Sequence, residues 1–459
     1  MLIKIHSLLF TLVLLSLTLE VSAQAPAPSE TVLGVVPVVD DGKDGVRPIK
    51  LAILPSLAPD LEDVIVRSVV RHDLELTGLF DVLDDAKAPT GFYGFDDPVD
   101  IDAWRNLGAE VIVKVAAKLD NKDRAKIFGV CYFLNVGKDP VYKKSILVPK
   151  ADVRVTAHRI TDALLGAITG RNGGFASHLA FAGRGARNHV VFTVDADGHN
   201  LTALTDPDQT SIAPEWGPAG HLFYASSVNY SPLFVVNHTT GARLGLPFKT
   251  SVYSTAFNRD KTRLAVAVAE GGQSAIYVGN ADGSAMARVS TTPLATHPSF
   301  SPSGKLAWIG GGENGTQRVY LEGKPVSPAG FPAAAPTFCD TEDGVFLVYA
   351  VGTGGDRHDL VMSNERGGGM VRLTQNQGSN TYPACSPDGR LLAYFSVRSK
   401  DSGLFVKSLK SWKEHKLSSR VGESLRWDAL PAVGAPMTAA PAPAPPAPTA
   451  TPTAPPSAP

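Results

Sequence analysis

The sequence contains few cysteines, no excess of one charge, and only one long apolar run. Three cysteines among 459 residues exclude a disulfide scaffold and a four-cysteine zinc site. The 43 Lys and Arg residues nearly balance the 44 Asp and Glu residues, so no global field draws the chain to nucleic acid or anionic lipid. After the first 23 residues no stretch approaches the length of a membrane span, so we expect no direct membrane insertion.

Glycine, proline and apolar residues are abundant. The chain has 43 Gly and 35 Pro, which is typical of an all-β array with many turns. At 44% hydrophobic and 19% charged residues, it can bury a core, which excludes disorder of the whole chain.

The two ends differ in composition from the rest. Residues 1–23 have a short basic start, an apolar run from Leu8 to Leu19 and a small-x-small site at Val21-Ser22-Ala23, and this order predicts a cleavable signal peptide. A retained anchor is the alternative, but the alanines and prolines that follow give no basic stop-transfer flank. In residues 431–459, 21 of 29 positions are Pro or Ala and none is charged, which predicts an extended, disordered tail.

Residues 49–172 alternate between strand and helix patterns. Strands are predicted at 49–54 and 80–83, and β-rich runs at 111–119, 126–136 and 145–148. Apolar residues at helical spacing predict helices from 61 to about 78, over 101–107, and from 160 to 170. This pattern indicates a small α/β domain with a mixed sheet.

Residues 175–430 contain a repeat of about 42 residues. Its fullest copy is the Tyr-Pro-Ala-Cys-Ser-Pro-Asp-Gly run at 382–389, where proline presets φ and glycine supplies a positive φ for a tight turn. The large residues that anchor the copies are Trp216, Phe257, Phe300, Phe338, Cys385 and Trp427. A period of this length with four short strands per copy is typical of propeller blades.

The two ends of the repeat region complete each other. The strands expected at 178–181, 190–194 and 201–204 lack an inner strand, whereas 424–427 is an inner strand without followers. Paired together they form one blade and close the ring. We therefore predict an α/β N-terminal domain with a mixed sheet, followed by an all-β six-bladed propeller.

Cysteines Cys339 and Cys385 fall at nearly equivalent inner-strand positions of neighbouring blades. A disulfide needs Cα atoms within about 7 Å, which adjacent inner strands rarely offer, so we expect two buried thiols. Cys131 is expected to pack on a strand of the first domain.

The sequence offers no catalytic, cofactor or metal site. A propeller-capped serine peptidase would need a Gly-x-Ser-x-Gly elbow and a hydrolase domain, and neither is present. The run 310–315 matches a dinucleotide-binding Gly-x-Gly-x-x-Gly only formally, because it joins two predicted strands and is expected to be a hairpin loop. The eleven histidines show no metal-ligand spacing.

Several segments resemble the TolB family, the periplasmic components of the bacterial Tol–Pal system. They are the blade repeats, the helix Ala-His-Arg-Ile-Thr-Asp-Ala at 157–163, the bridge at 173–181 and the Asp40–Ile49 segment. The resemblance covers roughly 32–430. The valine-rich 32–39 and the Pro/Ala tail depart from the family pattern.

The resemblance implies a non-enzymatic periplasmic scaffold. The family's propeller binds the lipoprotein Pal, and its N-terminal region engages TolA. By this resemblance the protein is a monomer without cofactors that couples the outer membrane to the energised inner-membrane complex and supports constriction at division. The alternative is a periplasmic propeller module that binds a peptide or sugar ligand.

Candidate partner-binding residues lie in two places. The first is the propeller rim, formed by the loops that lead into the inner strands, where small hydroxyl groups and occasional rings suit a polar protein partner. These residues are Thr296, His297, Ser379, Asn380, Thr381, Tyr382 and Tyr253. The second is a strap, residues 24–48, whose valine-rich part can add a strand to a partner's sheet edge. Its candidates for the TolA-like partner are Val35, Val36, Val38, Asp40 and Asp41.

Overall fold

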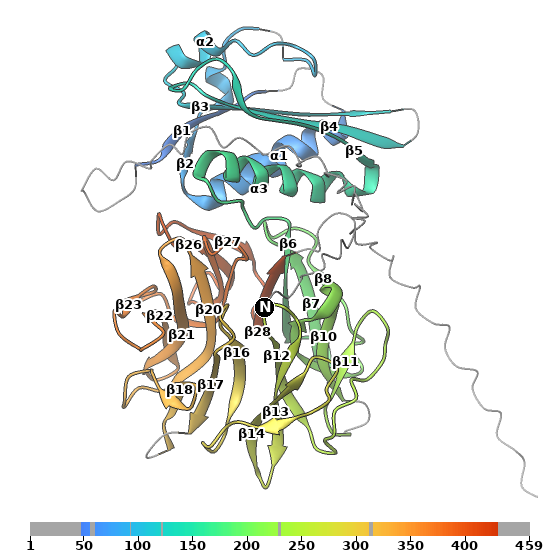
Figure 1. Cartoon of the computed structure of the whole chain (residues 1–459). Helices are drawn as coiled ribbons and strands as arrows, with labels where there is room; N and C mark the ends of the chain where they lie inside the picture. Colours follow the sequence, from blue (N-terminus) through green and yellow to red (C-terminus); the bar gives the residue numbers. More distant parts are fainter. Residues whose placement is uncertain are drawn as a thin grey trace, which may run out of the picture.

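The computed structural model describes residues 47–429 except 56–59, 92, 121–122, 228–230 and 312–314. The expected signal peptide, the strap candidates Val35 to Asp41 and the Pro/Ala tail lie outside the described residues. In Figure 1 the described part consists of an α/β domain stacked on one end of a β-propeller. None of the helices in this part is long and apolar enough to cross a membrane.

The α/β domain is built on one five-stranded sheet in the order β2-β1-β3-β4-β5. The strands are β1 (Ile49–Ile53), β2 (Phe80–Val82), β3 (Val111–Leu119), β4 (Arg124–Phe133) and β5 (Pro140–Pro149). Strand β1 runs parallel to β2 and β3, and the remaining pairs are antiparallel, so the predicted mixed sheet is confirmed.

Two long helices cover one face of this sheet and lie between it and the propeller (Figure 1). They are α1 (Leu61–Thr77) and α3 (Val153–Thr169); a short α2 (Ile101–Asn106) and three 3₁₀ turns at Asp85–Lys87, Lys150–Asp152 and Pro218–Gly220 complete the helical elements described. Helix α1 ends at Gly78, whose φ of 65° favours glycine. Helix α3 begins at Val153, earlier than the periodicity predicted, because Val153 and Ala157 also face the core.

The propeller has six small sheets, which we number as blades 1 to 6. Blade 1 contains β28 (Gly422–Ala429), β6 (Ser177–Arg184), β7 (His189–Asp195) and β8 (Thr202–Ala203). Blade 2 contains β9 (Thr210–Trp216), β10 (Leu222–Ser227) and β11 (Phe234–Asn237). Blade 3 contains β12 (Val252–Phe257), β13 (Arg263–Glu270), β14 (Gln273–Asn280) and β15 (Ala287–Arg288).

The other three blades each have four strands. Blade 4 contains β16 (Thr296–Phe300), β17 (Leu306–Gly311), β18 (Gln317–Leu321) and β19 (Lys324–Pro325). Blade 5 contains β20 (Ala333–Thr341), β21 (Gly344–Gly354), β22 (Arg357–Asn364) and β23 (Val371–Arg372). Blade 6 contains β24 (Ser379–Cys385), β25 (Leu391–Val397), β26 (Gly403–Ser408) and β27 (Glu414–Ser418).

The ring closes as the two incomplete ends of the repeat region predicted. The last strand, β28, pairs antiparallel with β6, with Trp427 opposite Leu179 and Arg426 opposite Ala180. The first blade therefore contains strands from both ends of the repeat region, and the six-bladed fold is confirmed.

The expectation of two thiols at Cys339 and Cys385 was wrong. The two cysteines form a disulfide, with their Cα atoms 5.3 Å apart. The cause is the convergence of inner strands toward the propeller axis, which brings β20 and β24 closer than strands on the outside of the blades. Cys131 is buried on β4, as predicted.

The rim segments expected to be loops are instead the first halves of the inner strands. Each of the six inner strands shifts register against its neighbour in this part, which marks a β-bulge. In five of the six strands a non-glycine residue at the bulge has a positive φ: Ala213, His297, Ala335, Tyr382 and Ser424. Because of the bulges, strand pairing continues through the segments that the sequence pattern indicated as loops.

The two domains share a hydrophobic core. The cluster around α1, α3 and the helix-covered face of the sheet continues into the propeller through Phe175, Ala196, Leu391 and Val406, all of which are buried. The domains are therefore packed against each other and not merely tethered.

Candidate functional site

The six inner strands surround a central channel. A cavity of about 150 Å³ in it is lined by residues from all six, including Glu215 of β9, Pro298 of β16 and Arg426 of β28. Arg426 pairs with the buried Glu215 across two blades, and burial raises the pKa of this carboxyl. Nearby, Lys261 binds Asp428 at 2.6 Å. The channel is thus polar and internally charge-paired.

The structure brings together two predicted rim residues from non-adjacent blades. His297 of β16 and Tyr382 of β24 face each other with ring centroids 6.0 Å apart. Burial, with a contribution from Arg426, lowers the pKa of His297 to about 4, so its ring is neutral at pH 7. Burial also raises the pKa of Tyr382 to about 12. This pair offers hydrogen-bonding groups and ring surface without a charge.

The other predicted rim residues divide into accessible and structural groups. Tyr253 of β12 is 41% exposed, and Thr296, Ser379 and Thr381 are partly exposed. Asn380 is fully buried; its amide donates to the His358 carbonyl at 3.2 Å and its carbonyl accepts from Ser396 at 2.8 Å. Asn380 therefore supports the blade and has no surface to offer a partner, which corrects its inclusion among the candidates.

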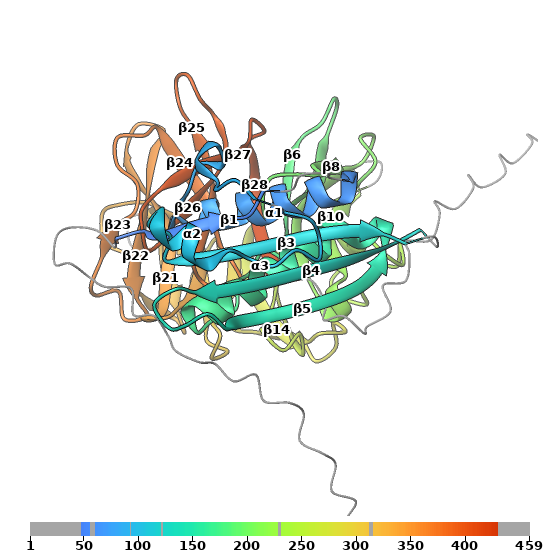
Figure 2. The ribbon, with the colours of Figure 1, turned by 90° about the horizontal axis from the view of Figure 1, so that it is seen from above.

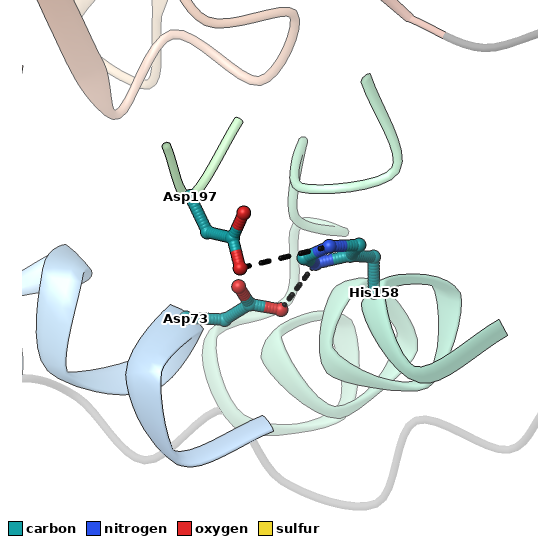
Figure 3. Close-up of side chains that lie close together, drawn as sticks. All are labelled: Asp73, His158 and Asp197. Carbon is teal, nitrogen blue, oxygen red and sulfur yellow. Dashed lines mark hydrogen bonds and ion pairs between the residues drawn. The ribbon is translucent and has the colours of Figure 1, made fainter. Parts of the chain in front are cut away.

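A second constellation lies at the junction of the two domains (Figure 3). Asp73 comes from α1, His158 from α3 and Asp197 from the turn between β7 and β8 of blade 1. His158 Nδ1 lies 2.8 Å from Asp73 Oδ2, and His158 Nε2 lies 3.9 Å from Asp197 Oδ2. All three side chains are buried.

Further charges surround this cluster. Arg154 on α3 pairs with Asp197 and lies 3.4 Å from Asp195, and His199 Nδ1 lies 3.3 Å from Asp197 Oδ2. Burial opposes the charge on His158, but the carboxylates of Asp73 and Asp197 raise its pKa. Burial raises the pKa of Asp73, whereas His158 and Arg154 lower the pKa of Asp197 despite its burial.

Among the described residues, Asp73, His158 and Asp197 could hold a cation, because their ligand atoms lie within 4.8 Å of one another. However, the Arg154 guanidinium already pairs with the Asp197 oxygen, and a metal ion there would face this fixed positive charge. The geometry fits an ion-paired lock between the domains better than a metal site.

Backbone groups at the junction are held by two further side chains. Asp162 of α3 accepts hydrogen bonds from the amides of Phe175 and Ala176, at 2.7 and 2.9 Å. Arg390, just after the Ser-Pro-Asp-Gly turn of blade 6, donates to the carbonyls of Arg171 and Asn172, at 2.8 and 2.9 Å. The turn that identified the repeat therefore also docks the first domain.

A cleft of about 330 Å³ opens beside this junction, and we call it the interdomain cleft. Apolar side chains from both domains line it, among them Leu79, Phe346, Met362 and Leu409. Its charged wall residues include Arg171, Arg390 and Lys410 as well as Glu342 and Asp343.

Comparison with known families adds a decisive observation. Residues 38–130 match the family model of the TolB amino-terminal domain, and residues 165–325 match that of the TolB beta propeller domain. The two ranges occur in the family's order and together cover more than half of the chain. The chain belongs to the TolB family.

Individual TolB proteins are similar over part of their length. The Tol-Pal system protein TolB of Anaeromyxobacter dehalogenans strain 2CP-C is 29% identical over 49% of this chain and 52% of its own length. That of Syntrophotalea carbinolica is 29% identical over 47% and 48%, respectively. This chain thus spans about half the length of these curated relatives. The crystal structure of TolB from Acinetobacter baumannii matches with a TM-score of 0.67 at 19% identity, covering 83% of this chain and 96% of that chain, and shows the same fold.

Sequence reasoning did not find the junction cluster or the charges of the channel. The Asp-Ala-Asp-Gly-His run at 195–199 was a usable signal, because two acids in one turn of a blade need basic partners when that turn is covered. The matching basic residues on the other domain, Arg154 and His158, lie four residues apart on α3, but they precede the helix predicted from 160 to 170.

Proposed function

We propose that this TolB-family chain is a non-catalytic periplasmic scaffold of the Tol–Pal system. In this proposal the propeller binds a Pal-like lipoprotein, and the strap binds a TolA-like protein. The observation that carries the proposal is the combination of the two TolB family matches with a polar, charge-paired channel and an internally paired junction. A polar, charge-paired channel suits protein recognition, and the scaffold would support outer-membrane integrity and constriction at division.

The proposed surface for the lipoprotein is the channel mouth on the propeller face opposite the α/β domain. Arg390, just after the Ser-Pro-Asp-Gly turn at the far end of β24, bonds the segment that follows α3, so the first residues of this strand lie at the free face. Tyr253, Thr296, Thr381 and the His297–Tyr382 pair are the contacts we propose. Neutral rings and hydroxyls there can accept a polar partner without leaving a charge unpaired.

For the strap, the proposed resting place is the interdomain cleft. The strap precedes β1, and the amide of Ile49 donates to the carbonyl of Leu79, which itself lines the cleft. Thirteen extended residues before Pro48 reach up to about 43 Å, so the valine-rich part can enter the cleft. Its valines match the apolar lining. Release from the cleft would then expose the strap to the TolA-like partner.

A binding experiment with charge-introducing variants tests the rim. Thr381→Arg and Tyr253→Glu should weaken binding of the soluble domain of a Pal-like lipoprotein, measured by calorimetry, while the melting temperature falls by no more than about two degrees. Val371→Glu, on the outer strand of blade 5 and 41% exposed, is the matched control and should bind as wild type does. If both rim variants bind normally, the interface lies elsewhere. If the wild type binds neither a Pal-like nor a TolA-like protein, the peptide- or sugar-binding module becomes the better reading.

A further inference from the structure

The face of the α/β sheet that points away from the propeller carries an unusual set of side chains. Helices α1 and α3 cover the other face, whereas the open face of β3, β4 and β5 points outward in Figure 2 and is covered in part by α2 and the loop before it. Four lysines belong to this open face: Lys114 and Lys118 on β3, Lys126 on β4 and Lys143 on β5. Their neighbours along β3, such as Val113 and Val115, point into the core instead.

The strand register places these lysines in a regular grid. Lys114, Val130 and Lys143 lie side by side across the three strands, and Lys118, Lys126 and Leu147 lie side by side two rows further on. The row between them holds Ala116, Phe128 and Ser145. The aromatic ring of Phe128 is therefore central among four ammonium groups.

This grid brings like charges together. Lys118 and Lys126 are directly opposite each other, and like charges in that relation are destabilising. Within the described ranges none of the four lysines forms an ion pair with a carboxylate; Lys114 is 4% exposed and donates to the Asp97 backbone carbonyl at 2.5 Å. Asp96 and Asp97, in the adjoining loop, are the acids that act on Lys114. An arrangement that is unfavourable in the free protein becomes favourable once an anionic ligand is bound.

Lys114, Lys126 and Lys143 line a groove, and Lys118 lies beside it as the cross-strand neighbour of Lys126. Its volume is about 410 Å³, and the loop from Phe95 to Val99, which includes Asp96 and Asp97, forms one wall. The ring of Phe95 lies 5.9 Å from that of Phe128, and Lys126 Nζ lies 5.6 Å from the Phe95 ring centroid. The aromatic pair gives the groove an apolar floor between the cations.

The shape and spacing of the groove favour an extended peptide. Successive rows of the grid are about 6.8 Å apart, and the side chains on one side of an extended peptide have the same period. Strand β5 is the last in the sheet order, so one side of its backbone has no partner strand in the described part of the chain, and this edge lies beside the groove. A flat bilayer surface cannot enter behind the Phe95–Val99 wall.

We propose that this groove binds an extended, acidic peptide segment of a partner protein, with carboxylates on Lys118, Lys126 and Lys143 and an apolar side chain on the Phe95–Phe128 floor. The surface faces away from the propeller, so this binding is independent of the channel mouth and of the interdomain cleft.

Fluorescence anisotropy of the mature full chain tests the proposal. The probe is a labelled ten-residue peptide of alternating Glu and Val, with a peptide of alternating Lys and Val as the opposite-charge control. The alternating acidic peptide should bind in a salt-sensitive manner, and Lys118→Gln with Lys126→Gln should weaken binding about tenfold. The same double variant should melt no lower than wild type, because it removes a repulsion. Lys144→Gln with Lys324→Gln, which removes equal charge outside the groove, should bind as wild type does.

Several results would overturn the proposal. One is equal loss of binding in the two double variants, which would show that net charge alone attracts the peptide. Another is equal affinity for a block peptide of five Glu followed by five Val, which would exclude recognition of an extended, alternating chain. Binding of phosphatidylglycerol vesicles, but not of the peptide, through Lys118 and Lys126 would assign the face to a membrane surface. Markedly tighter peptide binding after deletion of residues 24–44 would make the chain's own strap the occupant.

Discussion

The disulfide between Cys339 and Cys385 fixes two inner strands that meet at the channel. It closes a loop of 46 residues, and the chain-entropy relation gives a contribution of about 4 kcal/mol for a loop of this length. We therefore expect the Cys339→Ala, Cys385→Ala double variant to be less stable than wild type by up to about 4 kcal/mol in urea denaturation. A reducing agent should destabilise the wild type and leave the double variant unchanged. Equal stability of oxidised wild type and double variant would show that the bridge constrains nothing.

Asp162 gives the junction a pH dependence. Burial raises the pKa of its carboxyl to about 7, against the two backbone hydrogen bonds that favour its charged form, and Asp73 and Asp388 add to the rise. Because the folded pKa lies above the unfolded value near 4, the folded state holds a proton that the unfolded state has lost between pH 4 and 7. The contribution of Asp162 is thus complete below pH 4 and is lost as the pH rises to about 7.

Comparison with Asp162→Asn isolates this effect. The wild-type melting temperature should fall relative to that of the variant as the pH rises from 4 to 7, and the difference should be constant at higher pH. The two proteins need only be scanned side by side in the same buffers. A difference that does not change over this range would mean that Asp162 is ionised throughout.

At the scale of single residues, the sequence predicted chemistry only where the signal was local. Cys131 was placed correctly because alternation within one strand decides its burial. The bridge between Cys339 and Cys385 was missed because it depends on the convergence of strands from two blades, which no local pattern records. The lock of Asp73, His158 and Asp197 was missed for the same reason, since three elements and both domains supply it.

At the scale of elements, the closing strand β28 has the largest predicted effect. Its removal leaves β6, now the edge of blade 1, with unpaired backbone groups and exposes the cluster that holds Leu425. Truncation before Val421 should therefore cause aggregation or loss of cooperative melting. Deletion of residues 434–459 should be nearly silent, because that segment consists almost entirely of small residues and proline, with Met437 as its one large side chain. Equal stability of the two truncated proteins would contradict the closure by β28.

The elements also show where sequence patterns stop being sufficient. Type and order of the strands and helices in the α/β domain followed from periodicity, because each packs an apolar face on one of the two clusters that flank the sheet. The starts of the inner strands were mistaken for loops, because the bulges at residues such as His297 and Tyr382 break the alternation that identifies a strand. The conformation of the propeller strands near the axis depends on the whole ring of blades and not on the local sequence alone.

At the scale of the whole molecule, the junction couples surfaces that are far apart. The channel is formed by the same inner strands whose far ends carry the turns that dock α3, including Arg390 after β24. A partner that repositions β24 at the channel mouth can therefore act on the interdomain cleft through one packed element. Such coupling requires that the partner bind with different affinity to the protein before and after β24 is repositioned.

The strap is the part of the molecule where this coupling would become visible. If the strap rests in the interdomain cleft, docking in the cleft competes with binding of the strap to the TolA-like partner. Binding of the Pal-like lipoprotein then shifts the balance between these two states of the strap.

Deletion of residues 24–44 should abolish binding of the TolA-like protein, because the valine-rich segment that would add a strand to that partner is gone. Binding of the Pal-like lipoprotein should persist or become tighter, because the cleft no longer has an occupant to reposition. Calorimetry with each partner separately distinguishes the two effects. In a second variant, Phe346→Asp in the cleft wall with the strap intact, the docked strap is destabilised. This variant should therefore bind the TolA-like protein with higher affinity. Unchanged binding of the TolA-like protein after the deletion would show that the strap is a plain linker.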